Sequence, residues 1–253
     1  MGDFVQGLLG WQDWVVTSPA VPLTKVFDAG APTKALGVFG MTGMTAYFGM
    51  LDIGRPKVGE TVVVSGAAGA TGSVAGQIAR IKGCRTVGIA GGPEKCAWVT
   101  EVAGFDACID YKNEDVGKRL DELCPQGIDV YFDNVGGDLL DACLGRLAMK
   151  ARVVLCGGIS AYNATDPPPG PRNILMLIIR RARMEGFIIL DYADRFGEAA
   201  EELAGWHRSG QLNDAQDIAE GLETAPAALR RLFECRNLGK QLIKVAEPPI
   251  SVI

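Results

Sequence analysis

The sequence is poor in metal-binding residues and lacks a long apolar run. It contains a single histidine, His207, and its seven cysteines include no Cys-x-x-Cys pair. A zinc site of clustered cysteine and histidine is therefore not expected. The longest uninterrupted apolar run, residues 174–179, is far shorter than the ~20 residues that a membrane span requires. Because MGDFVQGLLG does not read as a signal peptide, we expect a cytoplasmic protein with reduced thiols.

Basic charge is also scarce. The net charge is -5 and the isoelectric point is about 5.1, so neither a nucleic acid nor an anionic membrane would be attracted electrostatically. Hydrophobic residues make up 48% and charged residues 22% of the chain, which is ordinary for a globular protein. These values favour a small molecule as the main partner.

Two common catalytic motifs are missing. Each of the five tyrosines lacks a lysine four residues later, which excludes the Tyr-x-x-x-Lys pair of short-chain dehydrogenases. No Gly-x-Ser-x-Gly segment occurs, which disfavours a serine hydrolase.

Between residues 60 and 190, short apolar runs alternate with amphipathic segments. The nearly continuous apolar runs are typical of strands buried on both faces, and such alternation predicts an α/β fold with a doubly wound parallel sheet. The expected strands are 61–65, 85–90, 107–110, 128–133, 152–156 and 184–190. The expected helices lie near 70–82, 94–103, 114–124, 138–148 and 173–182.

The first predicted strand leads into the glycine-rich stretch SGAAGATGSVAGQIA at 65–79. Aligned to the dinucleotide fingerprint G-x-G-x-x-G, it has alanine at the first glycine position, while Gly69 and Gly72 occupy the other two. Gly69 would let the backbone approach a pyrophosphate, and Gly72 would let the helix pack closely on its strand. A tightly packed turn without a ligand is the alternative, and the strand and helix on either side favour nucleotide binding.

The end of the second predicted strand indicates which dinucleotide binds. NAD-binding proteins usually place an acidic residue about 20 residues beyond the loop, where it accepts hydrogen bonds from the ribose 2′-hydroxyl. That position is Ile89, followed by Ala-Gly-Gly-Pro and then by Glu94 and Lys95. The small residues leave room for a 2′-phosphate that Lys95 could neutralise, although Lys95 could also be an ordinary exposed lysine. NADPH is therefore favoured over NADH.

Several motifs then occur in order along almost the whole chain. They are LLGWQDW at 8–14, GMTGMTAYFGMLDIG at 40–54, ETVVVSGAAGATGSVAGQIA at 60–79, IDYK at 109–112, YFDNVGG at 131–137, CGGISAYN at 156–163, RMEGFI at 183–188 and NLGKQLIKV at 237–245. In this ordered set the chain resembles the zinc-independent medium-chain dehydrogenases/reductases, specifically the branch of prostaglandin reductases and alkenal double-bond reductases.

This resemblance implies a set of cofactor-binding residues. Met41, Thr42 and Gly43 would lie beside the nicotinamide, and Ala68, Gly69, Ala70, Thr71 and Gly72 would surround the pyrophosphate. Lys95 and Tyr111 would hold the 2′-phosphate, Asn134 would follow a strand at the ligand-binding edge, Gly157 and Ile159 would approach the nicotinamide, and Asn237 would close over the cofactor. Structural roles remain open: Tyr111 could cap a strand, Asn134 could form an Asx turn, and Asn237 could end a helix.

The resemblance also implies the reaction. NADPH would reduce the carbon–carbon double bond of an α,β-unsaturated ketone or aldehyde without a metal ion. Tyr162 is the candidate catalytic residue, because a neutral hydroxyl could stabilise the negative charge that develops on the carbonyl oxygen.

Finally, the resemblance implies three segments. Residues 1–36 would be a remnant of the GroES-like catalytic domain, 37–216 a Rossmann NADP-binding domain, and 217–253 a return to the catalytic domain. The two chain ends would thus form an incomplete GroES-like β domain, because in the family a longer N-terminal segment precedes this point. The alternatives are a catalytically silent NADPH-binding or dimerising module and a quinone reductase; a homodimer is also an open expectation.

Overall fold

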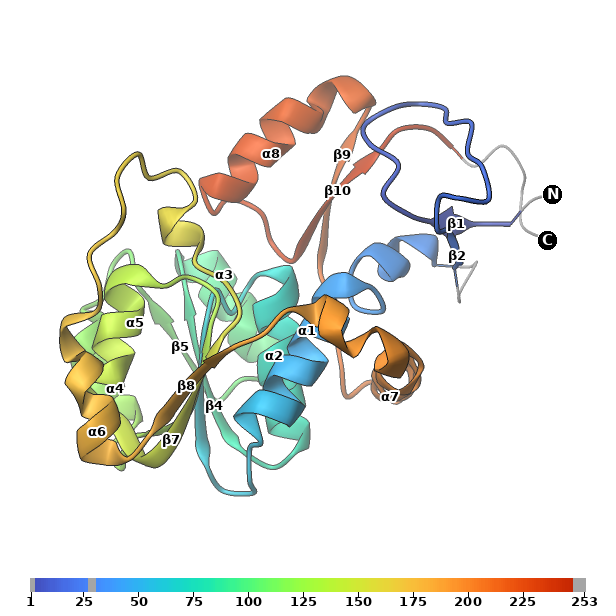
Figure 1. Cartoon of the computed structure of the whole chain (residues 1–253). Coiled ribbons are helices and arrows are strands. Elements are labelled where there is room, and N and C mark those ends of the chain that lie inside the picture. The colour runs from blue at the N-terminus through green and yellow to red at the C-terminus, as the bar shows by residue number, and fades with distance from the viewer. Residues whose placement is uncertain (1–2, 27–30, 248–253) are drawn as a thin grey trace.

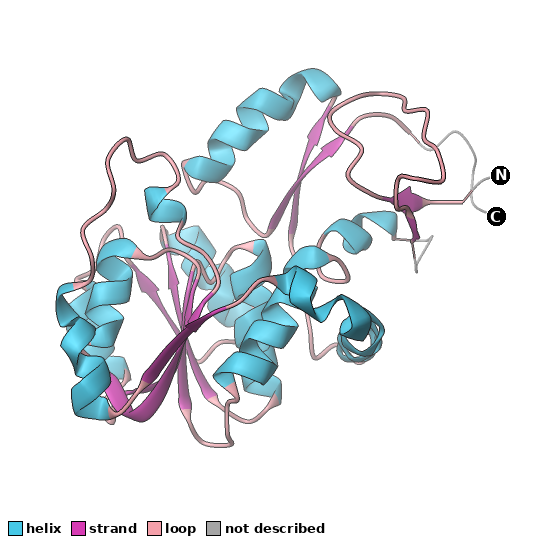
Figure 2. Ribbon diagram, viewed as in Figure 1, coloured by secondary structure: helices cyan, strands magenta, loops and turns pink. Residues whose placement is uncertain are grey.

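The computed structural model describes residues 3–26 and 31–247. Its centre is a six-stranded sheet with helices on both faces (Figures 1 and 2). Every neighbouring pair in the sheet is parallel, in the order β5-β4-β3-β6-β7-β8. The strands are β3 Thr61–Ser65, β4 Arg85–Ala90, β5 Ala107–Asp110, β6 Ile128–Asp133, β7 Leu147–Leu155 and β8 Arg183–Gly186. The predicted doubly wound α/β fold is confirmed.

The apolar run of β3 explains why helices cover both faces of the sheet. Side chains of a strand point alternately to opposite faces. Val62 and Val64 accordingly belong to one buried cluster and Val63 to another, and all three are fully buried. A strand of this composition is stable only with apolar helices packed against both sides.

The helices supply these two layers. Helices α1 and α2 and the buried residues of α7 contribute to the cluster around Val62, whereas α4 and α5 contribute to the cluster around Val63. The helices are α1 Met41–Phe48, α2 Ala70–Ile81, α3 Pro93–Glu101, α4 Val116–Leu123, α5 Gly137–Leu144, α6 Met176–Arg180, α7 Phe196–Arg208 and α8 Ala225–Phe233. Shorter helical turns are Pro32–Leu36, Gly49–Gly54, Ile159–Ala161, Arg172–Leu175, Ile189–Arg195 and Leu222–Thr224.

The boundary between α5 and β7 differs from the prediction. The expected helix 138–148 ends at Leu144, and β7 begins at Leu147 instead of residue 152. The N–H of Gly145 still closes the last helical turn on Asp141, after which Leu147 pairs with Ile128 of β6. A register irregularity then follows, and Lys150 has a left-handed φ of 60°. Because the pairing of β7 with β6 is interrupted here, the first half of β7 has no regular strand periodicity, and the sequence pattern did not predict it.

The last expected helix and strand are also shorter than predicted. The segment 173–182 divides into the turn Arg172–Leu175 and the five-residue α6, which ends where Arg181 takes a left-handed conformation. Strand β8 stops at Gly186, because it pairs only with residues 152–155 of β7. The remainder of the expected strand 184–190 leads into the turn Ile189–Arg195.

The two chain ends lie on the same side of the molecule (Figure 1). They form separate two-stranded sheets: β1 Val5–Gln6 with β2 Thr24–Lys25, antiparallel, and β9 Gln216–Glu220 with β10 Lys240–Lys244, parallel. The domain boundaries at residues 36 and 216 remain predictions. Over residues 3–26 and 31–247, no helix is both long and apolar enough to cross a bilayer.

Candidate functional site

A cavity of about 1100 Å³ opens where β3, β4, β6 and β7 end at their carboxyl edge. Ligands of open α/β sheets bind at this edge. All the residues predicted to form the site line the cavity except Met41 and Gly43. The predicted residues that line it are Thr42, Ala68, Gly69, Ala70, Thr71, Gly72, Lys95, Tyr111, Asn134, Gly157, Ile159, Tyr162 and Asn237.

The glycine-rich loop forms the floor of the cavity between β3 and α2. Gly66 has a φ of 62°, and the Gly69 N–H donates to the Gly66 carbonyl at 2.9 Å, which turns the chain sharply. A Cβ atom at Gly72 would lie 2.3 Å from the Gly66 carbonyl oxygen, so the first turn of α2 approaches the loop only because position 72 is glycine. Helix α2 begins at Ala70, and the first N–H groups of a helix have no partner within it. This end is therefore suited to bind an anion.

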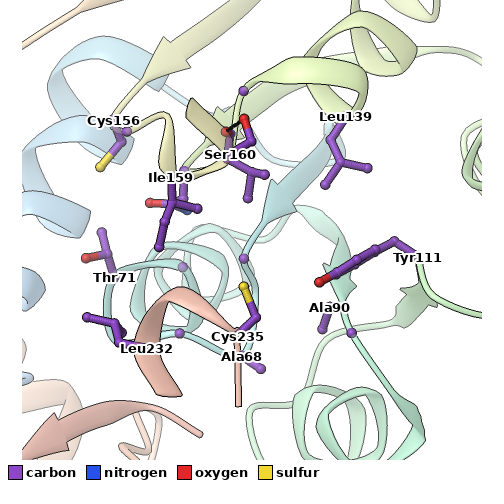
Figure 3. A pocket seen from close by; sticks show the side chains of 18 of the residues that line it. Ala68, Thr71, Ala90, Tyr111, Leu139, Cys156, Ile159, Ser160, Leu232 and Cys235 are labelled. Atoms are coloured by element: carbon purple, nitrogen blue, oxygen red, sulfur yellow. Dashed lines mark hydrogen bonds between the residues drawn. The ribbon is translucent and has the colours of Figure 1, made fainter. Parts of the chain in front are cut away.

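Lys95 and Tyr111 lie at the end of the cavity formed by β4 and β5. Lys95 is in the first turn of α3, and its Nζ donates to the carbonyl oxygen of Cys235 at 2.6 Å. Burial lowers the pKa of Lys95. The hydroxyl of Tyr111 points toward the Cys235 sulfur (Figure 3). Burial and, after it, the neighbouring Cys235 thiol raise the pKa of Tyr111.

The carboxylate of Asp110, the residue before Tyr111, is occupied by local hydrogen bonds. Asp110, the last residue of β5, accepts hydrogen bonds from the N–H groups of Gly92 at 2.7 Å and Lys112 at 3.1 Å, and from Asn113 Nδ2 at 2.7 Å. Burial alone would raise the pKa of Asp110, but these hydrogen bonds lower it overall. Its carboxylate therefore braces the turn after β4 and is not free to bind a ribose hydroxyl.

Asn134 joins the ends of β3 and β6. Its backbone N–H donates to Ser65 Oγ at 2.9 Å, and its Nδ2 donates to the Ser65 carbonyl oxygen at 2.7 Å. These two bonds fix Asn134 in the cavity wall. Asn134 directly follows β6 at the carboxyl edge of the sheet, and its role in ligand binding remains a prediction.

Asp133, which was not among the predicted site residues, is the anchor of this wall. The residue is fully buried, and its Oδ1 accepts hydrogen bonds from Ser65 Oγ and Tyr131 Oη, each at 2.8 Å, and from the N–H groups of Val135 and Gly136, each at 3.0 Å. The signal available in the sequence was an acidic residue directly after the apolar residues 130–132. Asp133 holds the loop 134–136 against β3.

The opposite end of the cavity contains the candidate catalytic residue. Tyr162 follows the turn Ile159–Ala161, its side chain is exposed, and its hydroxyl oxygen accepts the Gly158 N–H at 3.3 Å. Cys156, Gly157 and Ile159 line the adjoining surface.

Comparisons with known proteins agree with this architecture. Residues 70–205 match the family model described as zinc-binding dehydrogenase. The NADPH-dependent curcumin reductase of Escherichia coli is 46% identical across 97% of this chain and 72% of its own length, and the NADP(+)-dependent 2-alkenal reductase of Nicotiana tabacum is 42% identical across 97% and 72%. The crystal structure of Vibrio vulnificus CurA in complex with NADPH has a TM-score of 0.92 at 44% identity, covering 98% of this chain and 75% of that one.

The chain belongs to the medium-chain dehydrogenase/reductase family, in the branch of these double-bond reductases. The resemblance inferred from the ordered motifs is thereby confirmed. Within the described part of this reductase, no group of three or more His, Cys, Asp and Glu residues is arranged to hold a metal ion.

Met41 and Gly43 are the predicted residues that lie outside the cavity lining of this reductase. A Cβ atom at Gly43 would lie 1.8 Å from the Val38 carbonyl oxygen, so this glycine permits close packing at the start of α1. Thr42 and Thr45 are the residues of this helix that reach the cavity. A role for Met41 and Gly43 beside the nicotinamide remains a prediction.

The C-terminal segment of the reductase forms a cavity wall of which the sequence predicted only Asn237. That side chain is buried, and its Nδ2 donates to the Gly239 carbonyl at 2.8 Å. The Gly239 N–H in turn donates to the Ala68 carbonyl at 2.8 Å, which bridges the segment to the glycine-rich loop. Leu232, Phe233 and Cys235 extend this wall, and no local sequence signal marked them.

Proposed function

We propose that this chain is an NADPH-dependent reductase of the carbon–carbon double bond of α,β-unsaturated ketones and aldehydes. One observation carries the proposal: a single cavity runs from Lys95 and Tyr111, across the glycine-rich loop, to Tyr162. Cationic, anion-binding and hydroxyl groups are thus aligned in the order that a dinucleotide and a carbonyl substrate require. The relatives named as curcumin and alkenal reductases act on substrates of this class.

The cofactor is NADPH, in agreement with the sequence prediction. The N-terminus of α2 and the closely approached loop at Gly69 and Gly72 suit a pyrophosphate. Lys95 and Tyr111 suit a 2′-phosphate, while Asp110 is occupied by backbone N–H groups. At about 1100 Å³ the cavity is large by comparison with typical ligand sites, which leaves space for a substrate beside the cofactor.

The reaction requires stabilisation of a developing negative charge. When bound, NADPH supplies a hydride to the β-carbon of the unsaturated substrate. Tyr162 then donates a hydrogen bond to the carbonyl oxygen, on which charge accumulates as the enolate forms, and protonation of the α-carbon completes the reduction. Because the Tyr162 oxygen accepts the Gly158 N–H, its O–H bond is polarised toward a second acceptor. Ile159 and Cys156 add apolar surface that limits water beside the reacting carbon.

A Tyr162→Phe variant tests this role. Loss of one donor to a developing oxyanion is expected to lower kcat for an enone about 100-fold. The Kd for NADPH should remain unchanged, since Tyr162 is placed at the opposite end of the cavity from Lys95 and Tyr111. Tyr192→Phe is the matched control, because Tyr192 stacks on Phe48 away from the cavity. Equal turnover by Tyr162→Phe and the parent would remove Tyr162 from the mechanism.

Two alternatives are separated by one pair of assays. NADPH fluorescence titration measures binding, and NADPH oxidation measured with an alkenal, an enone or a quinone identifies the electron acceptor. Oxidation with the enone and alkenal supports the proposal, whereas oxidation with the quinone alone supports a quinone reductase. Binding without oxidation of any acceptor supports a silent NADPH-binding module.

We also propose that the chain forms a homodimer through β8, the edge strand of the sheet. Large apolar side chains on both sides of this strand in the sequence are exposed, namely Leu175, Ile178, Ile179, Ile188 and Leu190. Antiparallel pairing of two β8 strands about Met184 would place Arg183 opposite Glu185 of the second copy, a favourable cross-strand pair.

Light scattering tests the dimer. The parent should have a mass about twice the 26.8 kDa of one chain, and Ile178→Glu should shift the population toward the monomer, because a charge would be buried in the interface. A monomeric parent at micromolar concentration would contradict the proposal.

A further inference from the structure

Cys235 lies at a backbone position where glycine is the usual residue. Helix α8 ends at Phe233, the Arg236 N–H donates to the Arg231 carbonyl at 2.9 Å, and the Cys235 N–H donates to the Leu232 carbonyl at 3.1 Å. This pair of bonds is the Schellman motif, in which Cys235 takes the left-handed position. Its φ is 53°, which is unfavourable for a residue with a Cβ atom. The helix end alone would therefore favour glycine at position 235.

The left-handed turn directs two polar groups of Cys235 into the same end of the cavity. Its carbonyl oxygen accepts a hydrogen bond from Lys95 Nζ at 2.6 Å, and its sulfur faces the Tyr111 hydroxyl (Figure 3). Lys95, Tyr111 and Cys235 come from segments far apart in the sequence, and all three line the cavity. Cys235 thus connects the C-terminal wall to both residues expected to bind the 2′-phosphate.

These contacts add no negative charge near Lys95. Across residues 3–26 and 31–247, Lys95 forms no salt bridge, and its Nζ donates to the carbonyl oxygen of Cys235. The ammonium group is therefore held by a neutral carbonyl, an acceptor that a phosphate carrying close to two charges would readily replace. The site thus keeps its lysine in place without a direct carboxylate partner, and Asp217 and Glu94 act on it only from a longer distance.

We propose that Cys235 is a positioning residue that sets the selectivity for the 2′-phosphate of NADPH over the free 2′-hydroxyl of NADH. Its carbonyl orders the Lys95 ammonium and its thiol orders the Tyr111 hydroxyl before the ligand arrives, so that the phosphate meets groups already in place. This inference rests on the proposed use of NADPH. Cys235 belongs to neither the glycine-rich loop nor the candidate catalytic residue, so its proposed role is additional to theirs.

The substitution Cys235→Gly separates the thiol from the backbone. Glycine is favoured at the left-handed position and keeps the carbonyl that holds Lys95, so the fold should be at least as stable as the parent's. Loss of the thiol should free Tyr111 and raise the Kd for NADPH by about fivefold, as for one lost hydrogen bond. The Kd for NADH, which has no 2′-phosphate, should stay within about twofold of the parent's. Cys235→Ser should restore most of the NADPH affinity, because its hydroxyl can still pair with Tyr111.

Lys150→Gly is the matched control. Lys150 also has a left-handed φ, of 60°, but it is exposed on β7 and does not line the cavity. It should change thermal stability in the same direction as Cys235→Gly and leave both Kd values unchanged. Fluorescence titration of all four proteins with NADPH and with NADH measures the ratio of the two Kd values without reference to turnover.

The outcomes distinguish this inference from the function on which it rests. A parent protein that binds no NADPH overturns the proposed function and this inference together. A parent that prefers NADPH, with a Cys235→Gly variant whose NADPH to NADH ratio of Kd values is unchanged, overturns the role of Cys235 alone. A reduced preference in Cys235→Gly that Cys235→Ser restores supports it.

Discussion

Replacing Asp133 by alanine should lower the free energy of unfolding by about 3 kcal/mol or more, because four buried or partly buried donors lose their common acceptor. Those donors are Ser65 Oγ, Tyr131 Oη and the backbone N–H groups of Val135 and Gly136. Urea denaturation followed by circular dichroism would measure the change. Loss of these bonds should also release the loop 134–136 and weaken NADPH binding.

Asp138→Ala is the control for this substitution. Asp138 lies only five residues further along, but its side chain is fully exposed and its partner Arg172 is at 4.0 Å. The free energy of unfolding should change by less than about 0.5 kcal/mol. A similarly small change for Asp133→Ala would show that the hydrogen bonds to its Oδ1 contribute little to stability.

Replacing Lys95 by alanine should raise the Kd for NADPH by about 10- to 100-fold, which corresponds to one charge-assisted hydrogen bond to a phosphate. The Kd for NADH should change much less, since the lysine would have no phosphate to bind. Because this contact is ionic and partly exposed, added salt should weaken NADPH binding more in the parent than in the variant. Fluorescence titration at two ionic strengths measures both effects.

Lys118→Ala provides the comparison for Lys95→Ala. Lys118 is an exposed lysine of α4 whose removal makes the same change in net charge. The Lys118→Ala variant should bind NADPH with the same Kd as the parent. If Lys118→Ala and Lys95→Ala weakened binding equally, long-range charge rather than a direct contact at Lys95 would account for the effect.

The centre of the sheet was predictable because its strands are buried on both faces. The bounds 61–65, 85–90, 107–110 and 128–133 agree with β3, β4, β5 and β6. The predicted strand bounds differ from the structure at β7 and β8. These strands lie towards one edge of the sheet, where a strand needs less continuous apolar character. There, Lys150 and Arg181 take left-handed conformations that no hydrophobic periodicity reveals.

The candidate site likewise contains some residues that were predictable from the sequence and others that were not. The glycine-rich loop and Lys95 were predictable because each follows a buried strand and has a local chemical reason for its residue type. Asp133 was missed because its role depends on donors from Ser65 and from the next turn, which only the pairing of β3 with β6 brings together. Cys235 was missed because its left-handed backbone and its contact with Lys95 are tertiary features.

The hydrogen bond from Gly239 to Ala68 has a consequence for protein engineering. The glycine-rich loop lies within 37–216, yet the backbone that borders it at Gly239 comes from the segment that leads into β10. A chimaera that transplants 37–216 alone would carry the dinucleotide fingerprint but would lack one wall of the cavity beside it. A chimaera designed to exchange cofactor preference between relatives should therefore transplant residues 37–216 and 232–241 together.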